Sequence, residues 1–292
     1  MAIDELVRRM RGLGNPSVIG LDPRLESMPR HLAENAKTLS EAADAILEFN
    51  KALIDELWDI VPAVKPQIAF YEAYGWQGIK AYIETVAYAK KKGLIVIGDI
   101  KRGDIASTAQ AYAEAHLGPV YGEDFSTVNP YMGEDSLEPF IKVCKERSKG
   151  IFVLVKTSNP GSGQLQDLMV LSNGVQMPLY ESVGLMVKRL GEDLIGECGY
   201  SEIGAVTGVT HPAQAKRLRE LMPRTLFLAP GYGAQGAKAI DIADGSIVNS
   251  SRGIIEAHTR SPYKERFGEA GFAKAARAAA LDMREDLLCL RI

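Results

Sequence analysis

The sequence VIGDIKRGDIAST, residues 96–108, begins as an apolar run and ends as a charged one. Its first part has the length and composition of a buried strand, and a helical pattern begins near Ser107. Four charged side chains fall within six residues at the end of that strand: Asp99, Lys101, Arg102 and Asp104. We therefore predict a strand–loop–helix unit that presents ionisable groups at the carboxyl end of the strand.

The same kind of unit recurs along the chain. Short apolar runs typical of strands lie at residues 17–22, 63–70, 94–101, 125–130, 150–158, 203–209, 225–231 and 246–253. Helical patterns lie between them, and strands that alternate with helices pair in parallel. Eight such units in 292 residues predict an α/β fold, a (β/α)8 TIM barrel. An open, doubly wound sheet is the alternative, because periodicity does not show whether a sheet closes.

The barrel is expected to form a single domain over residues 1–292. An N-terminal helical segment precedes it, and an Ala-rich helix from about Pro262 closes the chain. Ser40 and Thr210 are predicted to cap the helices that follow the first and sixth strands. The connection 159–178 is predicted to be a long loop, and loops of this length are often lids.

Composition excludes several classes of protein. The chain carries a net charge of −3, a pI of about 5.9 and 46% hydrophobic residues. These values predict a folded core and argue against a general affinity for nucleic acid or membrane surfaces. The start, MAIDELVRRMRGLG, does not resemble a signal peptide, and no apolar stretch is long enough to span a bilayer. We expect a cytoplasmic protein.

Several residues are expected to have no chemical role. The cysteines are expected to be reduced, buried thiols: Cys144, Cys198 and Cys289. The histidines lack metal-ligand spacing and are expected at surfaces or helix ends: His31, His116, His211 and His258. Trp58 and Trp76 are expected to pack on helices. For Asn129 and Asp135, after the fourth strand, two interpretations stay open: either residue lines the pocket, or Asp135, beside Ser136, begins a helix.

Barrel enzymes carry their chemistry at the carboxyl ends of the strands. Asp22 and Lys65 are predicted at the ends of the first two strands, beside the end of the third. Side chains alternate along a strand, so Asp99 and Lys101 should share one face while Ile100 points to the other. We therefore predict an array of two ammonium groups and two or three carboxylates at the barrel mouth.

Such an array suits proton donation better than Schiff-base chemistry. A carboxylate about 4 Å from Lys101 contributes on the order of 4 kcal/mol at intermediate dielectric, which should hold the amine as ammonium. The carboxylates would also repel an anionic substrate group until it leaves, for instance as carbon dioxide. The simpler interpretation is an ion pair of Asp99 with Lys101, a solvated Lys65, and Asp104 stabilising a helix N-terminus. Buried pairs stabilise poorly, which favours the chemical interpretation of the whole set.

A phosphate site is predicted at the loops after the last two strands, PGYGAQG and NSSRG. Glycines allow backbone N–H groups to approach an anion, and Arg252 offers a fork that matches phosphate. Gln235 is expected to reach phosphate or base from the same region. The simpler interpretation is an ordinary turn and a surface arginine.

Four motifs together resemble the orotidine 5'-phosphate decarboxylase family, in its longer bacterial branch. They are DIKRGD (99–104), GLDPR (20–24), AVKPQ (63–67) and SSRG (250–253). The resemblance implies conversion of orotidine 5'-phosphate to uridine 5'-phosphate and carbon dioxide, the last step of de novo UMP synthesis. It implies neither a cofactor nor a metal.

The resemblance also implies a role for individual residues. Lys101 would give a proton to C6 of the pyrimidine, beside a departing carboxylate that faces Asp99. Lys65 would pair with Asp99 and the ribose, and Asp22 would bind the ribose. Ser158, in VKTSNPG, aligns with a serine that hydrogen-bonds the pyrimidine edge.

In the family, one segment reaches into the neighbouring subunit's site. The residues that match it here are Asp104, Ile105 and Thr108. The resemblance therefore implies a homodimer with shared active sites. The segment that closes over the substrate is left open between the connection 159–178 and the compact loop after the seventh strand.

Three other functions are weighed against this one. A magnesium-dependent sugar-phosphate enzyme on the same barrel should end its second strand in an acidic ligand, whereas this chain has Lys65. A Schiff-base aldolase would need a neutral Lys101. A non-catalytic nucleotide sensor would have no need of the charged array.

Overall fold

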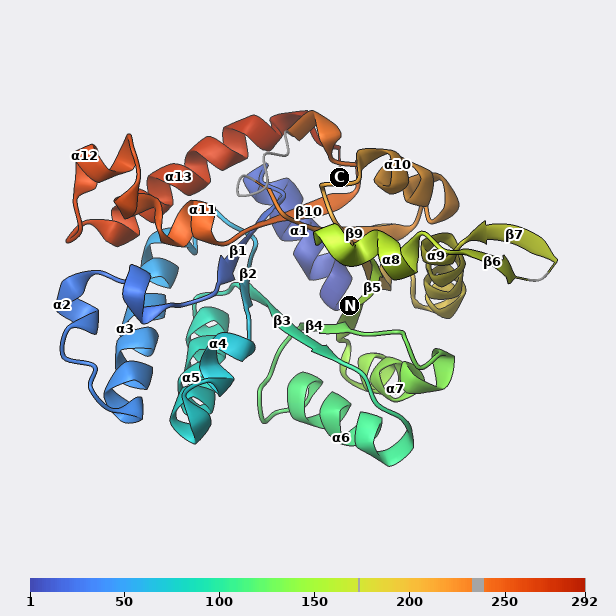
Figure 1. Cartoon of the computed structure of the whole chain (residues 1–292), viewed down its shortest axis with the longest axis horizontal. Helices are drawn as coiled ribbons and strands as arrows, with labels where there is room; N and C mark the ends of the chain where they lie inside the picture. Colours follow the sequence, from blue (N-terminus) through green and yellow to red (C-terminus); the bar gives the residue numbers. More distant parts are fainter. Residues whose placement is uncertain (173, 233–238, 292) are drawn as a thin grey trace.

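The computed structural model describes residues 1–172, 174–232 and 239–291. Eight parallel strands close into a barrel in the order β1-β10-β9-β8-β5-β4-β3-β2 (Figure 1). The predicted (β/α)8 barrel is confirmed, and the open sheet is excluded because β1 pairs with both β2 and β10.

The eight predicted strands are the eight barrel strands, and each begins within two residues of its predicted start. Their bounds are β1 Ser17–Leu21, β2 Ala63–Pro66, β3 Ile95–Arg102, β4 Phe125–Val128, β5 Gly150–Lys156, β8 Ser201–Thr207, β9 Thr225–Pro230 and β10 Ser246–Ser250. The second strand is shorter than predicted, because a short helix, α4 (Ala69–Glu72), begins within its expected range.

Helices surround the barrel in Figure 1. The longer ones are α3 Leu39–Leu57, α5 Gly75–Lys91, α6 Ala106–Leu117, α7 Glu138–Arg147, α9 Leu179–Leu190, α10 Pro212–Leu221 and α13 Phe272–Asp286. Short ones are α2 Arg30–Ala33, α8 Gly163–Gln166, α11 Arg252–Ile255 and α12 Tyr263–Phe267. The C-terminal Ala-rich helix is thus α13, which begins ten residues after Pro262.

Both predicted helix caps are wrong. Thr38, rather than Ser40, caps α3, and its hydroxyl accepts a hydrogen bond from the Glu41 N–H at 3.2 Å. Glu41 returns a bond to the Thr38 N–H, which completes a reciprocal capping box. The Thr210 hydroxyl donates to the Ser158 carbonyl at 3.2 Å instead of capping α10.

The N-terminal helix, α1 (Ala2–Leu13), closes the amino-terminal end of the barrel. Its apolar face consists of Ile3, Leu6, Val7 and Met10, all with no exposed surface. These side chains share a cluster with residues from the barrel interior, among them Phe125 from β4. In Figure 1 the helix (blue) lies across the ring of strands. The open end of the barrel is therefore the one at which the strands finish.

The connection 159–178 is more ordered than the sequence predicts. It contains α8 and an antiparallel hairpin, β6 (Met169–Ser172) with β7 (Val175–Pro178). The hairpin projects from the rim beyond α9 (Figure 1). Its outward side chains remain exposed, with Leu171 at 76%. In this hairpin the alternation of apolar and polar residues is short, and its apolar residues do not enter a core. The sequence therefore gives only a weak indication of these two strands.

Several burial predictions are wrong. Trp58 and Trp76 are exposed at 44% and 73%. His116 and His258 lie at helix ends as expected, but both are buried, and His116 Nδ1 lies 2.9 Å from the buried Glu123 carboxylate. Of the cysteines, Cys144 is buried, Cys198 is half-buried and Cys289 is exposed. Within the described residues, no helix combines the length and the apolar character needed to cross a bilayer.

Glu202, at the base of β8, gives the fold a pH dependence. One carboxylate oxygen accepts the Ile3 N–H at 3.1 Å, and the other has no partner among the described residues. Burial raises the pKa of Glu202 from its ordinary 4.5 to about 7. A raised carboxyl pKa favours the native state below pH 4.5, and this advantage is lost as pH rises through about 7.

We expect Glu202→Gln to stabilise the protein at pH 9 and to have little effect at pH 5, because glutamine never ionises. The raised pKa of Glu202 corresponds to at most about 3 kcal/mol in the free energy of unfolding. Urea denaturation of both proteins at the two pH values measures it, with the exposed Glu197→Gln as the control. A stability difference that is the same at pH 5 and pH 9 would contradict the assignment.

Candidate active site

The ends of β2 and β3 bring two lysines to one carboxylate. Lys65 Nζ lies 2.6 Å from Asp99 Oδ2, and Lys101 Nζ is ion-paired with Oδ1 of the same group. The side chains of Lys65 and Asp99 are 5% and 11% exposed, whereas that of Lys101 is 47% exposed. The pair of Lys65 and Asp99 is therefore fixed inside the mouth, and Lys101 is the member that faces the open side.

The charges of this cluster hold one another in the ionised state. Burial alone would raise the pKa of Asp99, but the charges of Lys65 and Lys101 outweigh it and hold that pKa well below its ordinary value. Burial would likewise lower the pKa of Lys65, but Asp99 and Asp22 outweigh it and raise that pKa. The site thus keeps a carboxylate and an ammonium ion in a largely desolvated place.

Asp22 follows β1 on the Lys65 side of the cluster. Gly20 of β1 lies opposite Lys65 of β2, which brings the end of β1 to the same edge. Asp22 Oδ1 is buried and makes no hydrogen bond with the described residues. Because buried polar atoms are normally paired, this oxygen is suited to receive a donor from a bound molecule.

The sequence did not single out Thr127, which also contacts the cluster. It lies on β4 with 1% of its surface exposed, and its hydroxyl is 3.0 Å from Asp99 Oδ1. A threonine in a strand is an ordinary core residue, so no local signal marks it. Only the pairing of β3 with β4 reveals the contact.

Three predicted site residues make no contact with this cluster in the interactions described. Asp104 Oδ1 accepts the N–H of Ile105 at 2.8 Å, and no ion pair joins Asp104 to Lys101 among the described residues. Ile105 is 50% exposed, and Thr108 is exposed in the first turn of α6. The structure therefore unites Asp22, Lys65, Asp99 and Lys101, and it leaves the segment 104–108 on the outside.

Two of the residues predicted to hold phosphate and base, Arg252 and Ser158, follow β10 and β5 at the same end of the barrel. Arg252 begins α11, is exposed, and makes no side-chain bond with the described residues. Gly20 is needed nearby, because a Cβ there would lie 1.8 Å from Ser251 Oγ. Ser158 is half-buried after β5. Gln235 lies outside the described residues.

An ion pair that includes a buried lysine holds the loop that carries Ser158. Lys156 Nζ lies 2.7 Å from Asp167 Oδ1, and the lysine side chain is only 1% exposed. Gln166 and Thr157 exchange two hydrogen bonds of 2.8 and 2.9 Å across the same loop. These contacts tie α8 to the end of β5.

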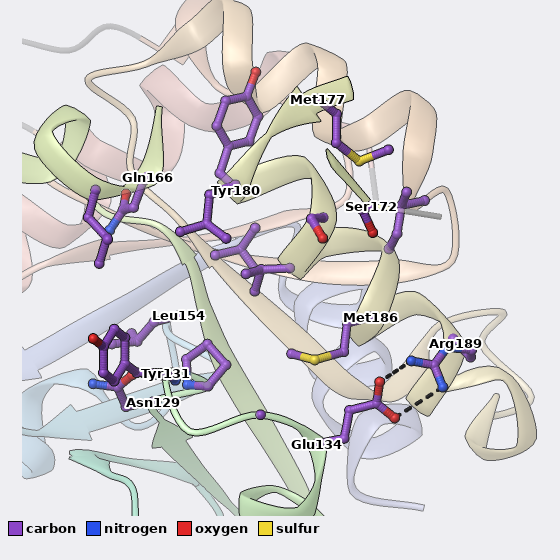
Figure 2. Close-up of a pocket in the computed structure, with 18 of the residues that line it drawn as sticks. Asn129, Tyr131, Glu134, Leu154, Gln166, Ser172, Met177, Tyr180, Met186 and Arg189 are labelled. Carbon is purple, nitrogen blue, oxygen red and sulfur yellow. Dashed lines mark hydrogen bonds and ion pairs between the residues drawn. The ribbon is translucent and has the colours of Figure 1, made fainter. Parts of the chain in front are cut away.

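A cavity of about 810 Å³ has a lining that includes none of the residues of the charged cluster. It is bounded by α9, the hairpin and the loop after β4. Figure 2 shows Glu134 and Arg189 paired at one end and Leu154, Tyr131 and Asn129 toward another side. Asn129 Oδ1 accepts the Tyr131 N–H, and Asp135 is exposed in a short 3₁₀ turn. Neither contacts the charged cluster in the interactions described.

In residues 1–172, 174–232 and 239–291, no three His, Cys, Asp or Glu side chains converge as metal ligands would.

Comparison with known proteins matches this barrel to one family. The model of the orotidine 5'-phosphate decarboxylase / HUMPS family matches residues 18–263. The chain belongs to this family. It is 45% identical to the orotidine 5'-phosphate decarboxylase of Petrotoga mobilis over 98% of both chains. It is 44% identical to that of Clostridium tetani, over 99% of this chain and 98% of the relative.

A solved structure agrees with this assignment. The OMP decarboxylase of Leishmania donovani superposes with a TM-score of 0.71 and 32% identity, covering 97% of this chain and 98% of that one. The family match spans every barrel strand, from β1 to β10, and therefore includes the whole charged cluster. The likeness to relatives extends further and includes α1 and α13.

The buried Lys156 of this family member gives a test of the β5–α9 loop. Asp167→Ala leaves a buried ammonium without its carboxylate, so we expect about 2 kcal/mol of destabilisation and faster amide exchange in residues 157–172. Lys156→Met removes the charge at similar volume and should cost less. Urea denaturation with hydrogen exchange measures both, and equal losses in the two variants would contradict a charge-based anchor.

Proposed function

We propose that this chain converts orotidine 5'-phosphate to uridine 5'-phosphate and carbon dioxide, with Lys101 as the proton donor. The observation that carries the proposal is the cluster in which Asp99 lies between the ammonium groups of Lys65 and Lys101. Family membership and the names of the full-length relatives support the same reaction. The proposal places it as the last step of de novo UMP synthesis, in the cytoplasm, in a chain that forms one domain.

The chemistry follows from the charges. A substrate carboxylate placed against Asp99 is repelled, and the bond from C6 to the carboxylate carbon breaks to release carbon dioxide. The electron pair stays on C6, where Lys101 stabilises it and delivers a proton. Lys101 then regains a proton from water, which its half-exposed side chain can meet. Lys65 remains paired with Asp99 throughout and keeps that carboxylate charged.

The remaining predicted residues would hold the rest of the nucleotide. Asp22 and Lys65 suit the ribose hydroxyls, because the buried Asp22 Oδ1 lacks a donor in the described part of the chain. Arg252, exposed and without a side-chain partner among described residues, suits the phosphate. Ser158 would bond the pyrimidine edge, and Gln235 would reach phosphate or base.

The same proposal includes a homodimer with shared sites. Asp104, Ile105 and Thr108 follow β3 near the barrel mouth, and Ile105 and Thr108 are exposed. Ile105 is exposed, and the Asp104 carboxylate bonds only the Ile105 N–H within the described part of the chain, so this segment is suited to contact a second subunit. In the dimer, these residues would complete the partner's site.

The magnesium-dependent alternative is disfavoured by Lys65. That reaction requires an acidic ligand at the end of the second strand, and here the position holds a buried ammonium ion. A cation at this place repels a divalent metal ion.

Turnover tests the proposal directly. Purified protein should deplete orotidine 5'-phosphate, followed by its loss of absorbance, equally with and without a chelator. Lys101→Ala should lower kcat by about 10²–10⁴-fold or more, because the proton donor is gone. The variant should still bind uridine 5'-phosphate. Normal turnover by that variant would refute the role of Lys101, and loss of activity in chelator would favour a metal enzyme.

Shared sites predict complementation between two inactive variants. In a heterodimer of Lys101→Ala with Asp104→Asn, one of two sites combines an intact Lys101 with an intact partner Asp104. Random reassociation makes half the dimers mixed, so we expect about a quarter of the wild-type activity to return. The control is Lys101→Ala mixed with itself. No recovery, in a mixture shown to have exchanged subunits, would contradict the shared site.

A further inference from the structure

The Thr127 hydroxyl makes three hydrogen bonds at the base of the charged cluster. It accepts from the N–H of Ile100 and from the N–H of Lys101, each at 3.0 Å. It also lies 3.0 Å from Asp99 Oδ1. A hydroxyl has one proton and two acceptor positions. Since the two N–H groups occupy both acceptor positions, the proton is donated to the Asp99 carboxylate.

The two N–H groups need this acceptor because β3 is irregular at that point. Gly98 pairs with Ser126 and Arg102 pairs with Val128, so β3 has two more residues than β4 in this interval. Lys101 has a φ of 48°, in the left-handed region that side chains rarely adopt. A bulge of this kind removes N–H groups from the regular ladder. The side chain of Thr127 supplies the acceptor that the backbone of β4 no longer provides.

The bulge determines where the proton donor lies. In a regular strand, side chains two residues apart stand about 6.6 Å from one another. Here the turned backbone at Lys101 lets its ammonium group reach the carboxylate of Asp99. Thr127 bonds both ends of this arrangement, namely the Lys101 N–H and Asp99 Oδ1. The second carboxylate oxygen, Oδ2, remains for Lys65.

We propose that Thr127 is a positioning residue for the decarboxylation, in that its hydroxyl sets the separation and direction of Lys101 relative to Asp99. This inference rests on the proposed function of the cluster. Thr127 does not itself touch the reacting atoms in this account. It acts through the backbone bulge and through the orientation of the Asp99 carboxylate.

Three variants separate positioning from plain core packing. Thr127→Val keeps the shape and removes the hydroxyl, and Thr127→Ser keeps the hydroxyl and removes the methyl group. Ser126→Ala is the matched control, because Ser126 is the neighbouring buried residue of β4 and its hydroxyl bonds Glu123 instead of the cluster.

We expect Thr127→Val to lower kcat by about 30-fold, because a misplaced donor lowers the rate even when the substrate is still bound. KM and the affinity for uridine 5'-phosphate should change by less than about 3-fold. Thr127→Ser and Ser126→Ala should retain kcat within about 3-fold. The inference is overturned by an unchanged kcat in Thr127→Val, by a loss in Thr127→Ser as large as in Thr127→Val, or by an equal loss in Ser126→Ala.

A second measurement does not depend on turnover. The amide protons of Ile100 and Lys101 should exchange at least about tenfold faster in Thr127→Val than in wild type, and Thr127→Ser should protect them. Unchanged exchange in Thr127→Val would overturn the role of Thr127 even in an active enzyme. If the wild type fails to turn over orotidine 5'-phosphate, the proposed function fails, and the exchange rates still decide whether Thr127 holds the bulge.

Discussion

The site depends on a single carboxylate, that of Asp99, shared between two lysine ammonium groups. Each member of this group needs the others, because an ion in a largely buried place is strongly destabilised without a partner. Lys65 is almost fully enclosed and its only side-chain bond described is to Asp99, so loss of the carboxylate would leave an isolated buried cation. The raised pKa of Lys65 and the lowered pKa of Asp99 are two consequences of the same attraction, which in each case exceeds the opposing effect of burial.

The barrel makes this arrangement possible by joining neighbouring strand ends. Asp22, Lys65 and Asp99 come from three consecutive barrel strands, and Thr127 comes from the next one. Helix α1 closes the opposite end with apolar side chains, so the charged cluster lies at the open end of the barrel. On β5, which pairs with β4, the Lys156–Asp167 pair ties down the loop that carries Ser158. The charged cluster and the neighbouring loop after β5 are thus each held by a buried ion pair.

Much of this organisation was predictable because it is local in the sequence. The β3 run and the charges that follow it are adjacent residues, and the repetition of strand and helix predicts the barrel. The contacts that were missed depend on the third dimension. Thr127 has no sequence signal, since its importance comes from a bulge in the neighbouring strand. His116 is buried because Glu123, seven residues away, returns beneath β3 to meet it. Trp76 is on a helix as expected, but on a face that the described elements leave 73% exposed.

The central claim is that Asp99 stays ionised because two ammonium groups hold it. A ¹³C NMR titration of the Asp99 carboxyl carbon tests this claim most directly. The account predicts an ionised chemical shift at every pH at which the protein remains folded, with no titration step near the ordinary value of about 4. In Lys65→Met the carboxyl should become easier to protonate, because one of its two cations is gone. An Asp99 that titrates at or above its ordinary value in the unliganded wild type would contradict the account.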